Sequence, residues 1–282
     1  MNQALRRIKI RFLFTLVLSV VLFLSFENTS KTIVVNDCEI TNNVFANGEK
    51  LVYKLYYNLG IIWIPAGEVV FTIKENSKSY EMTAIGKTYK NYEKIFKVND
   101  YFYSNVDRET LFPKNFVRII EEGNYKLYDS IYFDQKRNIV MSFNGKTKEE
   151  ARPKIHRVGE CMQDMVSNIY YMRNLNTDNI KKGDKIAIKM FFDKEVFPID
   201  IVYNGKEKKD IKDLGTFRTI KIQPNVVAGN VFRDGDKMTL WISDDANKLP
   251  LLIESPVSVG NVKAVLKSYT GLKHRLDSEI ID

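Results

Sequence analysis

The segment Leu51-Val52-Tyr53-Lys54-Leu55-Tyr56-Tyr57 decides the fold class of this chain, because its large side chains alternate along the backbone. Leu51, Tyr53 and Leu55 share one face of an extended strand, and the residues between them share the other face. A period of two is typical of a β-strand that packs one face against a core. The segment therefore predicts a strand near the start of the folded part, which we place at Gly48.

The same period predicts strands along most of the remaining chain. Beyond the first strand, we expect strands at residues 68–74, 80–84, 100–105, 115–120, 125–133, 139–143, 185–192, 198–204, 215–223, 237–243, 250–255 and 261–269. Polar turns such as Asn76-Ser77-Lys78 and Glu122-Gly123-Asn124 separate neighbouring strands, which favours antiparallel pairing. Residues 205–213 and 244–248 are expected to form further turns or loops.

One segment, residues 161–175, breaks this period. Its apolar residues recur at spacings of three and four, which indicates one face of a helix: Met162, Met165, Val166, Ile169 and Met172. Asp164 near the start and Arg173 near the end suit the helix dipole. We expect a helix packed on the sheet, with its apolar stripe buried and with Gln163, Asn168 and Asn174 exposed.

Many strands against one helix predict an all-β fold with one packed helix, built from large curved antiparallel sheets in a half-barrel or sandwich arrangement. The chain of 282 residues is 44% hydrophobic and 12% aromatic, which is enough for a sizeable core. We place the β-rich domain at residues 48–272, either as one unit or as two halves divided near the helix. Residues 27–47 are expected to form a linker or strap, and residues 273–282 a polar tail.

Residues 1–26 have the pattern of a signal peptide. Four cations precede a mostly apolar run at residues 12–26, namely Arg6, Arg7, Lys9 and Arg11. The run is shorter than the roughly 20 residues that a spanning helix needs. We expect a cleaved leader and a periplasmic or envelope-associated protein, and the alternative is an N-terminal anchor in the inner membrane. A lipoprotein is disfavoured because Cys38 does not follow small apolar residues.

The formal net charge of +8 does not indicate a nucleic-acid partner. Four of the cations lie in the leader, so the charge falls by four to +4 without it. The rest of the chain has no basic stripe with interleaved aromatic residues, which nucleic-acid binding needs. We expect no nucleic-acid partner and only weak attraction to anionic envelope surfaces.

The two cysteines, Cys38 and Cys161, enter an oxidising compartment if the chain is exported. A disulfide between them would tie the N-terminal strap to the start of the helix and remove on the order of 4 to 5 kcal/mol of unfolded-state entropy. The alternative is one buried thiol and one thiol in the N-terminal tail. The predicted state is the disulfide.

No catalytic signature is present in the sequence. It contains no Gly-x-Ser-x-Gly elbow, no His-Glu-x-x-His, no Walker-type loop and no Cys-x-x-Cys, and its two histidines are too few for a typical His-based metal site. The neighbouring carboxylates are expected in solvated turns: Asp193 with Glu195, Asp234 with Asp236, and Asp244 with Asp245. We therefore expect no enzyme activity, no catalytic or metal-binding residues and no cofactor.

Two stretches are candidate binding elements. Residues 146–157 include Lys154 and Arg157, whose charge suits phosphate or anionic sugar, although exposed charged connections are usually only solvated. Residues 60–67 carry Ile62 and Trp63 and are expected to join the first two strands. If exposed, this apolar stretch would form a binding lip or a membrane contact, whereas if buried it would close one end of the sheet. We expect Trp63 to be buried.

Several short motifs together resemble one family. They are Phe45-x-x-Gly48-Glu49-x-Leu51-x-Tyr53, Trp63-x-x-Ala66-Gly67, Gln163-Asp164 with Tyr170-Tyr171-Met172-Arg173, and Trp241-x-Ser243-x-Asp245 with Pro250 and Gly260. From residue 45 onward the chain resembles the DUF3108 family of uncharacterised bacterial envelope proteins. The resemblance implies an exported β-rich domain without assigned catalytic residues. The architecture is also similar to the half-barrel lipoprotein carriers of the periplasm, as an analogy of fold alone.

Two functional hypotheses follow. In the first, a non-enzymatic envelope protein encloses an apolar or amphipathic ligand, such as a lipid or a lipid-linked glycan, between a curved sheet and the methionine-bearing helix. Such a carrier needs an apolar pocket of several hundred Å3. In the second, a structural or assembly factor contacts other envelope proteins through sheet edges or the Trp63 segment. A glycan-acting enzyme is a third and weaker alternative. The candidate binding residues are Trp63, Ile62, Met162, Met165, Lys154 and Arg157.

Overall fold

The computed structural model describes residues 31–34, 40–59, 62–94, 97–225, 237–256 and 260–281. Residues from Thr32 to Asp282 form one compact unit, and this unit contains both hydrophobic clusters of the structure. The expected signal peptide and Cys38 lie outside the described residues. Within the described part, no helix combines the length and the hydropathy that crossing a bilayer requires.

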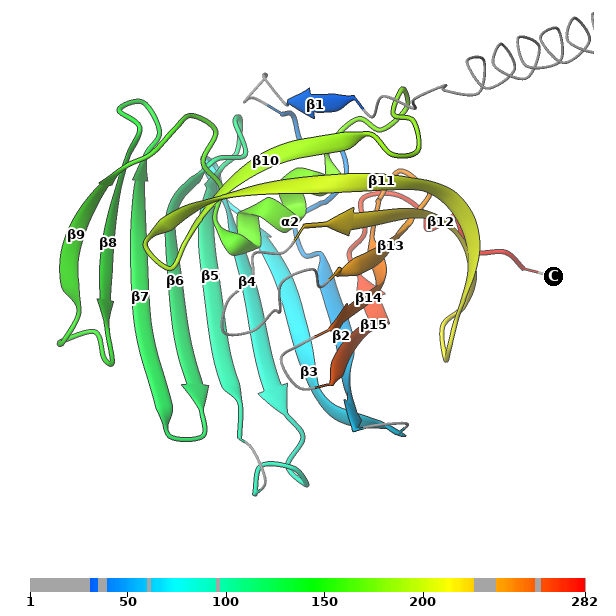
Figure 1. The fold of residues 1–282 in the computed structure, drawn as a ribbon, viewed down its shortest axis with the longest axis horizontal. Coiled ribbons are helices and arrows are strands. Elements are labelled where there is room, and N and C mark those ends of the chain that lie inside the picture. The colour runs from blue at the N-terminus through cyan, green and yellow to red at the C-terminus, as the bar shows by residue number, and fades with distance from the viewer. Residues whose placement is uncertain are drawn as a thin grey trace, which may run out of the picture. The chain divides into compact units, whose positions relative to one another are not determined.

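The described residues form fifteen strands and one helix (Figure 1). The first nine strands are β1 (Thr32–Val34), β2 (Lys50–Leu59), β3 (Ile62–Glu75), β4 (Ser79–Thr88), β5 (Asn99–Asp107), β6 (Pro113–Glu122), β7 (Tyr125–Asp134), β8 (Ile139–Gly145) and β9 (Arg152–Arg157). The helix α2 (Met165–Arg173) follows. The chain continues with β10 (Lys185–Phe192), β11 (Glu195–Ile211), β12 (Gly215–Pro224), β13 (Thr239–Ser243), β14 (Pro250–Pro256) and β15 (Asn261–Thr270).

All fifteen strands belong to one sheet in the order β1-β10-β11-β12-β13-β14-β15-β2-β3-β4-β5-β6-β7-β8-β9. Every neighbouring pair is antiparallel except β1 with β10. The last strand of the chain, β15, pairs with β2 in the middle of the sheet, so segments far apart in the sequence lie side by side there. The sheet curves but does not close into a barrel, because β1 and β9 are its two edges. The predicted all-β class with one packed helix is confirmed.

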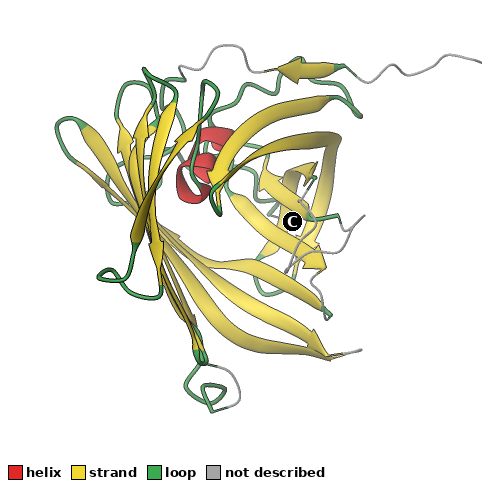
Figure 2. Ribbon diagram, turned by 60° about the vertical axis from the view of Figure 1, so that its left-hand side comes forward, coloured by secondary structure: helices red, strands yellow, loops and turns green. Residues whose placement is uncertain are grey.

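The helix lies on the concave side, between the two arms of the sheet (Figure 2). The chain leaves β9 at one edge, passes through α2 and enters β10 at the other arm. Buried apolar residues of both arms pack around the helix and its Tyr170, among them Met82, Phe116 and Ile201. A second cluster forms around Phe217, Trp241 and Leu251, where Leu272 and Leu276 of the C-terminal segment pack on it.

The C-terminal segment is bound to the sheet. The amide of Arg218 donates to the carbonyl of Ser278 at 2.8 Å, and the Ser278 side chain is fully buried. Gly271 brings the start of this segment close to the backbone of Gly48, where a side chain at residue 271 would collide with the Gly48 carbonyl. Both glycines have positive φ, 67° and 82°.

Three expectations about local structure are wrong. Residues 152–157 form the edge strand β9 instead of an irregular connection. The expected loop at residues 205–213 is largely strand, since β11 continues to Ile211 and accommodates Gly205, with φ of 92°, at a register shift. Likewise, residues 62–67 are part of β3 and do not form a connection between strands. In each case, pairing with a neighbouring strand of the sheet decides the outcome, and this pairing is not visible in the local sequence.

The helix is shorter than expected and rotated about its axis. Met162 and Val166 are buried as predicted, but Met165, Ile169 and Met172 are only half-buried. Gln163 and Asn168, expected on the exposed side, are buried. The reason is that polar groups at the two ends of the helix fix its orientation.

Candidate functional site

Arg173, at the C-terminal end of α2, ties three distant segments together. Its guanidinium donates twice to the Glu49 carboxylate, at 2.6 and 2.9 Å, and both side chains are almost completely buried. It also donates to the carbonyls of Asn247 at 3.1 Å and Val44 at 3.2 Å. We call Arg173, Glu49, Val44 and Asn247 the Arg173 hub. Because the two charges are paired bidentately and each of the three guanidinium nitrogens donates at least one hydrogen bond, the hub is a well-satisfied buried ion pair.

Aromatic residues surround this hub. Tyr170 lies one helical turn before Arg173, whose guanidinium stands 5.3 Å from the ring centroid. Phe45 packs edge-on against both Tyr170 and Tyr80, at centroid distances of 5.3 and 5.0 Å. The Tyr53 hydroxyl donates to the carbonyl of Pro250 at 2.8 Å. Residues of the family motifs therefore meet at one place in the structure.

Asp164 fixes the other end of the helix. It is the N-cap, and its carboxylate accepts from the amides of Val166 at 2.7 Å and Ser167 at 2.8 Å. The Ser104 hydroxyl of β5 donates to the second carboxylate oxygen at 2.5 Å. Burial raises the pKa of Asp164 to about 6, although these hydrogen bonds oppose the shift. The helix is thus held to the sheet at both ends.

An apolar pocket of about 170 Å3 lies beside the helix, between α2 and the sheet. Ile169, Tyr170, Met172 and Arg173 of the helix form one wall. The other walls come from β2, β3 and β12–β15, with Leu51, Tyr53, Leu55, Val69, Phe71, Ile222, Leu240, Ile242, Pro250, Ile253 and Ala264. A cavity of about 150 Å3 lined by aliphatic and aromatic side chains stays dry and accepts benzene. The pocket is therefore large enough for a small hydrocarbon group.

The pocket walls carry no unbalanced charge. Arg173 is paired with Glu49, and burial raises the pKa of both Tyr53 and Tyr170, so both hydroxyls stay neutral. An ionised ligand group placed here would lose its hydration, and no unpaired charge in the walls would compensate for that loss. The pocket suits the apolar part of a ligand and not a charged head group.

A second buried arginine, Arg118 on β6, lies on the same concave face. It contacts Asp129 at 3.2 Å and Asp193 at 2.7 Å, and Phe192 stacks on it at 4.3 Å. Its Nε atom is buried without a hydrogen-bond partner among the described residues. Burial raises the pKa of Asp129, with Arg118 opposing, and burial raises the pKa of nearby Asp100 to about 6. Because Asp129 is almost fully buried, this cluster does not present two accessible carboxylates for glycan hydrolysis.

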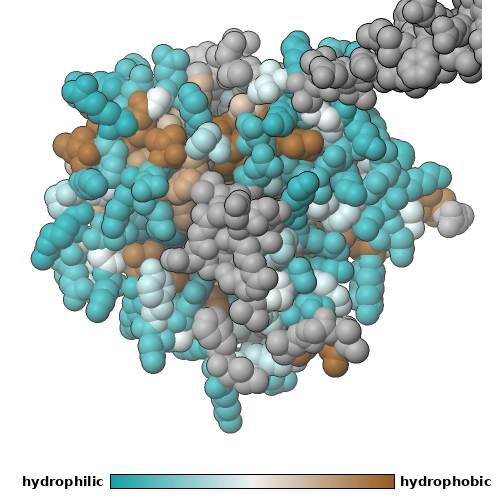
Figure 3. Space-filling model, in the orientation of Figure 1, coloured by the Kyte–Doolittle hydropathy of each residue, from teal (hydrophilic) through white to brown (hydrophobic). Residues whose placement is uncertain are grey.

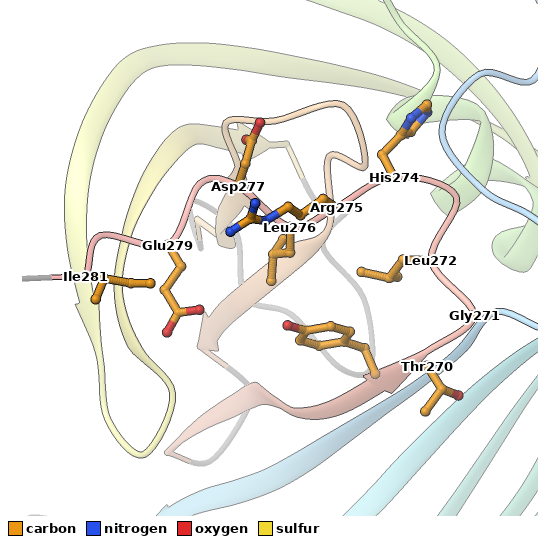
Figure 4. A pocket seen from close by; sticks show the side chains of 10 residues that line it. Thr270, Gly271, Leu272, His274, Arg275, Leu276, Asp277, Glu279 and Ile281 are labelled. Carbon is orange, nitrogen blue, oxygen red and sulfur yellow. The ribbon is translucent and has the colours of Figure 1, made fainter.

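A larger hollow of about 640 Å3 lies beside the C-terminal segment (Figure 4). Its side chains include Tyr269, Arg275, Asp277 and Glu279, and most of them are exposed. The Asp277 carboxylate forms an ion pair with Arg218 at 3.3 Å. This open surface depression lacks the enclosing apolar walls of the pocket beside the helix.

The structure does not bring the candidate binding residues together. Ile62 and Trp63 lie at the start of β3, where Ile62 is 63% exposed and Trp63 is half-buried beneath the ammonium of Lys263, 4.3 Å from its ring. Trp63 is thus less buried than expected, because one face of this strand end is open to solvent.

The other candidates lie elsewhere. Lys154 and Arg157 are exposed on the edge strand β9. Met162 is fully buried, and Met165 packs against the same hydrophobic cluster. Neither methionine lines the apolar pocket, whereas Ile169 and Met172 from the same stripe do.

Sequence reasoning missed Glu49 and Arg173 as interacting residues. They are separated by 124 residues, and no local period links them. The available signal was their presence in the motifs that carry the family resemblance, Gly48-Glu49 and Tyr170-Tyr171-Met172-Arg173. Within the described residues, no group of three or more His, Cys, Asp or Glu side chains is arranged to hold a metal ion.

The predicted disulfide has one partner, Cys38, outside the described residues, so the bond stays a prediction. Cys161 itself lies just before the helix with φ of 59°, and the described residues include no free cysteine.

Among solved structures, one with a TM-score above 0.5 shows a similar fold. A β-barrel-like protein of domain of unknown function DUF1849 from Brucella abortus aligns with a TM-score of 0.54 and 9% identity, covering 80% of this chain and 98% of that chain. A putative exported protein with a YmcC-like fold from Bacteroides fragilis has a TM-score of 0.31 and 10% identity, over 82% of this chain and 99% of that chain. No curated protein matches.

The model of a protein family of unknown function, DUF3108, matches residues 52–267. The matched region includes α2, all of β3–β14 and most of β2 and β15, together with the walls of the apolar pocket except Leu51. The chain therefore belongs to the DUF3108 family.

Proposed function

We propose that this is an exported, non-enzymatic protein that binds the end of one hydrocarbon chain of an amphipathic ligand in the apolar pocket beside α2. The observation that carries the proposal is the pocket itself, an apolar space of about 170 Å3 with neutralised walls. Export is supported by the leader-like residues 1–26. The head group of the ligand stays outside, because the walls offer it no counter-charge.

The size of the pocket limits the ligand. It is smaller than the several hundred Å3 that would enclose a whole drug-sized ligand or lipid. A pocket comparable to a benzene-binding cavity takes the end of one chain. Ile169 and Met172 border it from the helix, and the flexible methionine adapts to chains of different shape.

The test is ligand recovery from purified protein. Organic-solvent extracts of the wild type should contain a hydrocarbon-bearing molecule in stoichiometric amount. The variant Ala264→Phe should lose it, because the added ring fills the pocket from its wall. Ala187→Phe serves as the control, since Ala187 is also half-buried but lies on β10 outside the pocket. Clean extracts from repeated wild-type preparations, or equal recovery from Ala264→Phe, would contradict the proposal.

A second candidate function is docking of another envelope protein along β9. This edge strand carries Ile155, which is 67% exposed, in register with Met141 and Tyr132 on the same face. The proposal ranks second because Pro153 and several charges on β9 are typical of edges protected against pairing. A photoreactive residue at position 155 should give a discrete cross-linked product in cells, and its absence would exclude this function.

A further inference from the structure

One end of the sheet combines exposed apolar and cationic side chains. β2 ends and β3 begins there, and the neighbouring connection between β4 and β5 lies at the same end (Figure 1). We call Ile62, Trp63, Lys87, Lys90, Lys94 and Lys97 the docking end. Figure 3 shows a small hydrophobic patch beside the ends of β2 and β3, and hydrophilic side chains projecting below β4.

The apolar part consists of Ile62 and Trp63. Ile62 is 63% exposed at the first position of β3. Trp63 is half-buried, with its ring under the Lys263 ammonium at 4.3 Å. An indole beside a lysine, next to an exposed aliphatic residue, is typical of a surface that meets the boundary between lipid head groups and hydrocarbon.

The cationic part consists of four exposed lysines. None of Lys87, Lys90, Lys94 and Lys97 forms an ion pair with the described residues. Between these lysines in the sequence, the exposed carboxylate is that of Glu93. Glu68 lies opposite Lys87 in the sheet, but its carboxylate already accepts from Lys267 at 2.6 Å and from the Tyr89 hydroxyl at 2.8 Å. Glu121 and Glu122 lie beside Lys97, but the four lysines outnumber these two carboxylates and Glu93. The balance of charge is therefore positive, which complements anionic lipid head groups.

The backbone links the two parts. The amide of Tyr89, between Lys87 and Lys90, donates to the carbonyl of Ala66 at 3.0 Å, so the lysine-bearing connection is bonded to the strand that carries Ile62 and Trp63. A bilayer is broad enough to contact Ile62 and the exposed lysines together, whereas a small ligand is not.

An apolar row also connects the pocket with this end. Leu55 lines the pocket, and Tyr57 follows on the same face of β2. Tyr57 pairs with Ile64 on β3 and with Val262 on β15, and Ile62 lies two residues from Ile64 on that face. The row thus places apolar side chains between Ile62 and the pocket wall at Leu55.

We propose that the docking end binds the surface of a bilayer containing anionic phospholipid. Entry of a lipid chain along the apolar row rests on the proposed function, but the docking itself does not. Ile62 inserts below the head groups, and the lysines contact lipid phosphates.

The experiment is vesicle flotation of residues 32–282, the compact unit that contains both hydrophobic clusters, after circular dichroism and melting confirm its folding. Phosphatidylcholine vesicles are compared with vesicles that also contain phosphatidylglycerol. The wild type should float with the anionic vesicles, and the affinity should fall about fivefold for each lysine removed in Lys94→Ser and Lys97→Ser.

Matched variants on β9 serve as controls. Ile62→Asp should abolish flotation, while Ile155→Asp, which changes an isoleucine of similar exposure, should leave it unchanged. Lys154→Ser with Arg157→Ser controls for net charge. Absence of wild-type flotation, or equal losses in the β9 variants, would overturn the proposal. Flotation without ligand in solvent extracts would contradict the pocket function alone, and ligand without flotation would contradict the docking alone.

Discussion

Two buried arginines on the concave face differ in how completely their surroundings satisfy them. Arg173 uses donors on all three of its guanidinium nitrogens and binds Glu49 bidentately. Arg118 contacts two aspartates through one nitrogen, and its buried Nε has no hydrogen-bond partner among the described residues. The hub around Arg173 therefore holds the helix in one position, whereas the cluster around Arg118 retains one buried polar atom without a partner, the Arg118 Nε.

The two buried arginines therefore have different roles. The Arg173 hub borders the apolar pocket and removes charge from its wall, so it supports binding without contacting a polar ligand group. The Arg118 cluster lies under the tip of the β10–β11 hairpin, where Asp193 and Lys194 have positive φ of 48° and 68°. Its carboxyl groups with raised pKa make this region sensitive to pH.

The largest effect is expected for Arg173→Met. Glu49 would remain buried without a partner, which typically costs 3 to 5 kcal/mol of unfolding free energy. Urea denaturation measures this loss. The double variant Glu49→Leu with Arg173→Met removes both charges and should recover part of it. If Arg173→Met unfolded as readily as the wild type, the hub would not hold the helix.

Arg118→Met should lower the free energy of unfolding by less, about 2 kcal/mol at pH 7, because Arg118 uses only part of its hydrogen-bonding capacity. Asp129 would be left buried, but its raised pKa allows it to take up a proton. The loss in unfolding free energy should therefore shrink between pH 7 and pH 5 in parallel denaturation experiments. A loss as large as that of Arg173→Met would remove the distinction between the two regions.

Asp100→Asn tests the pH sensitivity of the second region. Burial raises the pKa of Asp100 from 3.8 to about 6, with Glu122 adding to the shift and Arg118 opposing it. The folded protein therefore binds this proton more tightly than the unfolded chain does, and the ionised group lowers stability above pH 6. As pH falls from 7 towards 4, the wild type should gain stability relative to Asp100→Asn.

The asparagine retains an acceptor for the Glu121 amide, which donates to Asp100 at 3.1 Å, so the variant changes charge more than hydrogen bonding. Unfolding free energies of both proteins at several pH values provide the measurement. A constant difference between the two curves would show that Asp100 does not titrate in this range.

The smallest effect is expected for Trp63→Ala, which lies outside both clusters. Because Trp63 is half-buried and its main specific contact is the Lys263 ammonium, the loss should be about 1 kcal/mol rather than the 3 to 5 kcal/mol of a core tryptophan. Thermal melting measures it. A loss above that of Arg118→Met would place Trp63 in the core after all.

The strands were predictable from sequence because their alternation is local. The segment around Leu51, Tyr53 and Leu55 shows its buried face directly, and these same residues line the pocket. The sequence did not indicate the edge strand β9. Its side chains are mostly exposed, so its residues do not alternate between apolar and polar as a half-buried strand does.

The site was predictable only in part. The apolar stripe of the helix was recognised, and Ile169 and Met172 do border the pocket. The rotation of the helix was not, because buried polar anchors at Asp164 and Arg173 decide it. Their partners, Ser104 and Glu49, are distant in sequence, so no periodic pattern indicates them.

The most direct test of the account is isoleucine methyl NMR of residues 32–282 during titration with octanol. Ile169, Ile222 and Ile253 line the pocket, whereas Ile155 is exposed on β9. If the pocket binds hydrocarbon, Ile169, Ile222 and Ile253 should show saturable shifts, Ile155 should show none, and the pocket shifts should be lost in Ala264→Phe. Unchanged pocket methyls, or shifts that persist in Ala264→Phe, would contradict a hydrocarbon-binding pocket beside the helix.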